Sequence, residues 1–70
     1  MEKNVATALL NAAVSLNEKL GEMDLIVSSI TDPDTKKKYV KALGNIIGGI
    51  TIDIILPIVG EYPDLDPYKT

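Results

Sequence analysis

The sequence predicts an all-α protein in which two amphipathic helices fold back on each other as an antiparallel hairpin. Two observations lead to this fold class. Apolar residues recur at alternating steps of three and four along two segments, which is the period of helices that pack along one stripe. One short, proline-containing turn separates the segments, and a short connection between helices makes them antiparallel neighbours.

The first helix is expected over about residues 2–30. Gly21 costs about 1 kcal/mol relative to alanine and, with Lys19 just before it, could act as a C-terminal cap that splits the segment into two helices. The apolar stripe keeps the same phase on both sides of Gly21, so one long helix, bent at that residue at most, is favoured over two. The stripe consists of Ala6, Leu9, Ala13, Leu16, Leu20, Met23, Val27 and Ile30.

The turn is expected at residues 31–33, where the sequence reads Thr-Asp-Pro. The residue before a proline avoids helical dihedral angles, so Asp32 suits the N-cap position and Pro33 the first helical residue. Asp34 then lies in the first turn, where the helix dipole favours a negative charge.

The second helix is expected over about residues 33–56, because the ring of Pro57 would collide with the carbonyl of Asp53 and end or kink the helix. Residues 61–70 form an acidic, proline-containing tail that is expected to be extended and folded over one end of the hairpin, with Leu65 and the tyrosines available for docking. The stripe that matches the first helix consists of Val40, Leu43, Ile47, Ile50 and Ile54, widened on one flank by Tyr39 and Ile46.

The composition limits the chemistry of this chain. Its 70 residues have a net charge of -3 and include no His, no Cys and no Arg. Imidazole and thiolate relays, disulfides and metal sites with nitrogen or sulfur ligands are thereby excluded. The acidic balance argues against a nucleic-acid partner. We expect no enzymatic activity, no cofactor and no metal.

The second helix carries more apolar residues than one stripe needs. A chain of this size buries only about 60% of its unfolded surface and is marginal as a monomer. We therefore expect two hairpins to associate as a homodimer, a four-helix bundle, through a second face on which small residues allow close approach. The predicted interface consists of Gly44, Gly48, Thr51, Ile52, Ile55, Leu56 and Val59.

A membrane span over residues 42–60 is the alternative. Its 19 residues just reach spanning length, and lysines precede it while acids follow it. Asp53 near its middle offsets much of the gain from its ten Leu, Ile and Val residues. The matched stripes of the two segments favour the soluble hairpin. No basic segment followed by a clean apolar core opens the chain, so a cytoplasmic location is expected.

Two further features have both a functional and a plain interpretation. Asp53 is a carboxylate among isoleucines, and it is either a buried acid with a raised pKa or a solvent-facing residue at the edge of the stripe. A lysine cluster is either a site for an anionic partner or a solvated helix face. The cluster consists of Lys36, Lys37, Lys38 and Lys41.

The function expected from these features is that of a small, non-enzymatic interaction module, of a regulatory, adaptor or inhibitor-like kind, that acts through a self-associating surface. The alternative is a membrane-associated protein that uses residues 42–60 as a span or an interfacial segment. This expectation rests on the small size of the chain and on the absence of the usual catalytic side chains, because no functional site is identified in the sequence.

Overall fold

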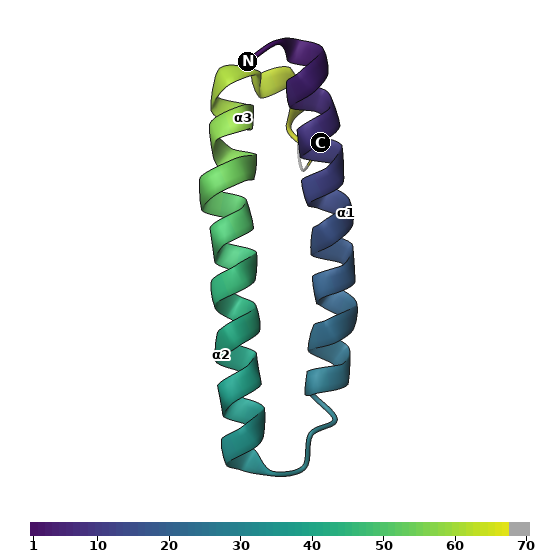
Figure 1. Ribbon diagram of the computed structural model, residues 1–70, viewed down its shortest axis with the longest axis vertical. Helices are drawn as coiled ribbons and strands as arrows, with labels where there is room; N and C mark the ends of the chain where they lie inside the picture. Colours follow the sequence, from purple (N-terminus) through teal and green to yellow (C-terminus); the bar gives the residue numbers. More distant parts are fainter. Residues whose placement is uncertain (68–70) are drawn as a thin grey trace.

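Two long helices lie side by side and antiparallel in the computed structural model, which describes residues 1–67 (Figure 1). The first, α1, spans Lys3–Val27. The second begins with α2 (Pro33–Ile50), passes through one π-helical turn, η1 (Thr51–Ile55), and ends with α3 (Leu56–Glu61). A 3-10 turn, η2 (Pro63–Leu65), follows. The described residues contain no strand, which confirms the all-α hairpin.

The α1 helix runs without interruption through Gly21, as predicted, but ends three residues before the predicted boundary. The hydroxyls of Ser28 and Ser29 donate to the carbonyls of Leu25 and Ile26, each at 2.6 Å. The backbone N–H groups of Ser29 and Ile30 also bond three residues back, to Ile26 and Val27. These shorter bonds satisfy the last carbonyls of the helix and tighten the chain into the turn.

The second helix begins at Pro33, as the sequence predicts, and Asp32 caps it. A carboxylate oxygen of Asp32 accepts hydrogen bonds from the backbone N–H of Thr35 at 3.0 Å and from its hydroxyl at 2.5 Å. Because the charged carboxylate receives these bonds, first from the hydroxyl and then from the backbone, they lower the pKa of Asp32 from its ordinary value.

This cap predicts a specific contribution to acid sensitivity. Since the folded-state pKa of Asp32 lies below the unfolded-state value, its stabilisation is present above the unfolded pKa and is lost as the pH falls through the folded pKa. Asn caps a helix about as well as Asp but does not titrate. Urea unfolding of Asp32→Asn between neutral pH and the acid limit should therefore show a weaker pH dependence than the native chain. Superimposable pH profiles would contradict the capping role.

The core lies along the seam, which we define as the line of contact between α1 and the second helix. The predicted stripe of α1 is only partly correct, because Leu9, Leu16 and Met23 are exposed while Leu10 is buried. Apolar residues occupy two adjacent stripes of α1, and the periodicity does not tell which of them faces the neighbour. The buried residues are Ala6, Leu10, Ala13, Leu20, Val27, Leu43, Ile50, Ile55 and Ile58.

The second helix does not end at Pro57 but continues to Glu61, because the η1 turn accommodates the proline. In this turn the N–H of Leu56 bonds to the carbonyl of Thr51, five residues back. A π turn holds one extra residue, so every later residue is rotated by one position, about 100°, relative to an uninterrupted α-helix. This rotation brings Ile55 and Ile58 into the seam, where they are 2% and 3% exposed.

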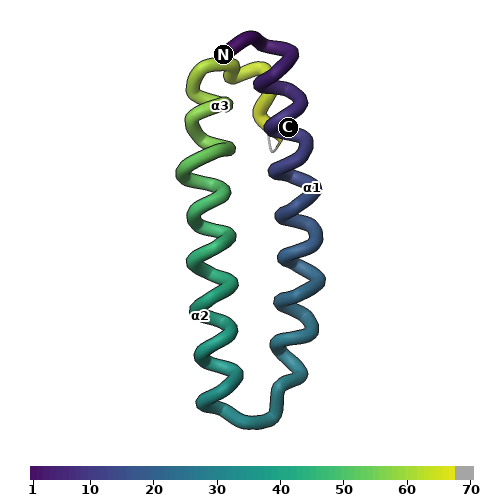
Figure 2. Tube along the Cα trace, viewed as in Figure 1, coloured from purple at the N-terminus to yellow at the C-terminus, as the bar shows by residue number. Residues whose placement is uncertain are grey.

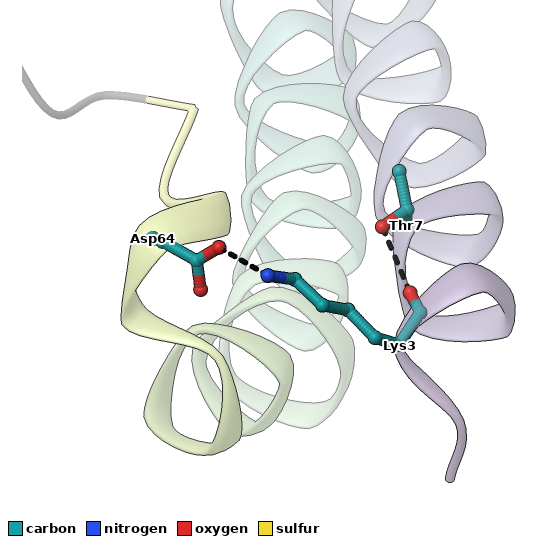
Figure 3. Close-up of polar contacts among 3 residues, drawn as sticks. All are labelled: Lys3, Thr7 and Asp64. Atoms are coloured by element: carbon teal, nitrogen blue, oxygen red, sulfur yellow. Dashed lines mark hydrogen bonds and ion pairs between the residues drawn. The ribbon is translucent and has the colours of Figure 1, made fainter.

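The segment after Glu61 folds over the end of the hairpin at which α1 begins (Figure 2). The Tyr62 hydroxyl donates to the carbonyl of Met1 at 2.7 Å, and the Lys3 ammonium lies 2.5 Å from an Asp64 carboxylate oxygen (Figure 3). The terminal amine lies 3.7 Å from Glu61, and Leu65 packs against the core. Residues 61–67 of the tail therefore lie over one end of the hairpin, as predicted, but they are not extended throughout, because Pro63–Leu65 form a 3-10 turn. Tyr68 lies outside the described residues.

Candidate interaction surface

No enclosed chemical site stands out in the part of the chain that the structure describes. Residues 1–67 form no pocket, and within them no group of three or more acidic side chains is placed to hold a metal ion. The candidate functional features are therefore surfaces: a second apolar stripe, the row of small residues, the lysine cluster and Asp53.

The α1 helix carries a second apolar stripe beside the seam. Val5, Leu9 and Ile26 each come one residue before a buried residue of the seam. Leu16 and Met23 follow Leu9 at heptad spacing and so lie on the same stripe. One residue corresponds to about 100° of rotation, so this stripe lies on the flank of the helix rather than on its back. Its large members are 42–69% exposed and comprise Val5, Leu9, Leu16, Met23 and Ile26.

The second helix has a corresponding stripe with the same offset. Tyr39 and Ile46 are 47% and 49% exposed, and Ile46 precedes the seam residue Ile47, just as the small residues Ala42 and Gly49 precede Leu43 and Ile50. The two helices are antiparallel and face each other, so the same rotation about each axis carries both stripes to one broad side of the hairpin. We call this side the apolar face: Val5, Leu9, Leu16, Met23, Ile26, Tyr39 and Ile46.

The row of small residues lies on the opposite broad side. Gly44, Gly48 and Thr51 each follow a seam residue by one position. They are therefore rotated by about 100° from the seam, in the direction opposite to the apolar face. A Cβ atom added at Gly44 or Gly48 would meet nothing within 4 Å. The small size of these residues therefore serves no close contact inside the described hairpin.

The remaining members of the predicted interface divide between core and surface. Ile52 and Leu56 are exposed, at 64% and 55%. Ile55, in contrast, is buried in the seam, and Val59 is partly buried against the core. The expectation that Ile55 and Val59 face away from α1 is wrong, because the π turn rotates both toward it.

The lysine cluster lies at the turn end of the second helix. Lys37, Lys38 and Lys41 are exposed and Lys36 is half-buried. The Lys38 ammonium lies 5.8 Å from the centroid of the Tyr39 ring, within the range of a cation–π contact. The cluster is a solvated helix face that remains accessible to an anionic partner.

Asp53 lies in the π turn and is exposed. It follows Gly49 by four residues and precedes the seam residue Ile54, so its register places it at the edge of the apolar face. In the single hairpin Asp53 is therefore a solvent-facing carboxylate, which fits the plain interpretation rather than that of a buried acid.

Asn17 is a feature that the sequence reading missed. It occupies a seam position between Ala13 and Leu20, and its side-chain carbonyl oxygen is buried without a hydrogen-bond partner among the described residues. A single polar residue in a helical seam fixes register or oligomeric state at a cost in stability. Asn17 follows Ala13 by four residues and precedes Leu20 by three, and this spacing places it in the seam. The spacing is decisive only when Leu10, rather than Leu9, is known to face the second helix.

Comparisons with family models, with curated proteins and with solved structures find no match to this chain.

Proposed function

We propose that the protein is a small, non-enzymatic helical interaction module that acts through a self-associating surface. The observation that carries the proposal is the apolar face, where seven large apolar side chains are at least 42% exposed on one side of a hairpin. Soluble monomers rarely expose contiguous apolar patches larger than a few hundred Å², and larger patches mark interaction sites.

The same hairpin supports no competing catalytic proposal. An enzyme of this composition would have to work with carboxylates, lysines and hydroxyls alone, and the described residues gather none of these around a pocket. A surface, in contrast, needs no enclosed volume, and four-helix bundles assembled from two hairpins need only matching apolar stripes.

A membrane-associated protein is the second candidate, and one observation favours it. The continuous helix Pro33–Glu61 has 29 residues and is long and apolar enough to cross a membrane, judged by length and composition alone. At 1.5 Å per residue it measures about 43 Å, more than the roughly 30 Å of a hydrocarbon core. Only 22% of its most apolar 18-residue stretch is buried in the hairpin.

Sedimentation equilibrium of the full chain without detergent separates the two candidates. We expect a soluble species of twice 7.5 kDa at micromolar concentration, because burial of the apolar face favours pairing. A monomer under these conditions would refute self-association. Precipitation that only detergent prevents, together with flotation on vesicles that contain anionic lipid, would instead support the membrane candidate.

A further inference from the structure

We infer that the occupant of the apolar face is a second copy of this chain, packed face to face, and that the opposite side with Gly44 and Gly48 stays outside the dimer contact. This inference rests on the proposed function and assigns the surface that carries it. It replaces the interface that the sequence alone suggests.

The first argument is the period of the apolar face. In α1 its members recur at steps of four and seven, from Val5 to Leu9, then to Leu16 and Met23, and Ile26 follows three residues later. These positions share one heptad frame, as the seam positions do. A helix with two heptad stripes side by side packs against two neighbours, which is the situation of every helix in a four-helix bundle and not of a helix in an isolated hairpin.

The second argument is the surface area. The chain exposes 5072 Å², whereas a compact monomer of its mass exposes about 4,250 Å². The excess of about 800 Å² equals what each partner buries in a dimer interface of standard size. Burial of this area against one further copy brings the exposed area of each chain to that of a compact monomer of its mass.

The third argument is the shape. The radius of gyration is 14.6 Å and the hairpin measures 46 × 21 × 16 Å. A compact chain of 70 residues has a radius of gyration of about 11 Å, and one of twice that length about 14 Å. A second hairpin stacked on the 16 Å dimension yields a bundle with the proportions of a compact protein of the combined size.

The charges around the face favour a protein over a lipid surface as the occupant. Lys19 continues the stripe of α1 between Leu16 and Met23, and Asp53 continues the stripe of the second helix. Each charge costs about 3 kcal/mol at the centre of a bilayer. In a protein interface, in contrast, these exposed side chains can extend to water, and Lys19 keeps its ion pair with Glu22, 3.2 Å away.

The test compares one substitution on each side of the hairpin by sedimentation equilibrium. Leu16→Glu places a charge at the centre of the apolar face and should weaken dimerisation by at least about 100-fold, as expected for an interfacial anchor. Gly48→Glu places the same charge on the opposite side, and Ser15→Glu places it one residue away on the back of α1. Both controls should dimerise within about threefold of the native chain, the scatter of near-neutral surface changes.

The outcomes test the proposed self-association and the assignment of its surface separately. A native chain that is monomeric refutes the proposed function and the inference together. If the native chain is a dimer that Gly48→Glu dissociates and Leu16→Glu does not, the inference is overturned while self-association stands. The same conclusion follows if neither variant dissociates the dimer. Circular dichroism verifies that each variant is helical. If Leu16→Glu is unfolded, Ile26→Glu, which replaces a side chain 69% exposed in the hairpin, is the variant that decides.

Discussion

Replacement of Ile55 by alanine should destabilise the protein by about 2–5 kcal/mol, the cost of truncating a fully buried isoleucine. A domain of this size has only about 4–10 kcal/mol of stability in total, so much of the population should unfold at moderate denaturant concentration. The physical reason is the π turn, which rotates Ile55 into the seam and leaves it 2% exposed. Urea unfolding followed by circular dichroism measures the loss.

Ile52→Ala is the matched control for this substitution. Ile52 lies in the same turn, three residues away, but is 64% exposed, so the same truncation should change stability by no more than about 0.5 kcal/mol. Both changes also have the same effect on helix propensity, which cancels in the comparison. Equal losses at the two positions would show that the helix keeps uninterrupted α-helical phase in solution.

Replacement of Asn17 by leucine should have the largest stabilising effect, about 1–3 kcal/mol. The amide oxygen of Asn17 has lost its contact with water and has no hydrogen-bond partner among the described residues, and leucine of similar size removes that cost while adding apolar contact in the seam. Each kcal/mol corresponds to about 4–8 °C in the thermal midpoint of a small domain. Calorimetry of the two proteins measures the difference.

Asn11→Leu is the control for the change at Asn17, because Asn11 is exposed in the same helix. It captures the gain in helix propensity that any Asn to Leu change brings, about 0.5 kcal/mol. The difference between the two variants therefore reports the seam alone. If both gain the same stability, the carbonyl of Asn17 finds a partner in solution, and the seam has no polar defect.

Stability and association are connected through the two stripes of α1. The seam stripe holds the hairpin together, while the adjacent stripe, with Leu9 and Leu16, is left for a partner. Both stripes have the same period and similar composition, so a rotation of α1 by one residue position, about 100°, exchanges their roles. Asn17 marks the seam stripe with one polar residue, and Lys19 marks the other with a charge. We expect these two residues to help the helix choose which stripe faces α2.

The sequence alone correctly predicts the parts of the fold that depend on local chemistry. The cap by Asp32 and the start at Pro33 follow from dihedral preferences and hydrogen bonds within a few residues, and the continuity of α1 through Gly21 follows from the unbroken phase of its apolar residues. The structure shows each of these features. The boundary at Val27 and the fate of Pro57 are missed, since serine hydroxyls and a π turn offer the backbone alternatives that no periodicity reveals.

The candidate surface is only partly contained in the sequence. An excess of apolar residues over one stripe, and hence the need for a partner, can be counted directly. The sequence does not determine which of the two adjacent stripes becomes the surface, because the stripes are offset by a single residue and both follow the same heptad spacing.

The sequence by itself determined an all-α hairpin with one cap, one turn and a surplus of apolar side chains, because these follow from residue types and their spacing along one helix. Only the tertiary structure decided that Leu10 rather than Leu9 faces the second helix, that Ile55 lies in the core and that the tail is held over the N-terminal end by contacts with Met1 and Lys3. Those choices depend on how two helices pack together and on one extra residue in a turn. The choices at Leu10 and Ile55 are each a helix rotation of about 100°, which is one residue in the sequence but decides which side chains meet.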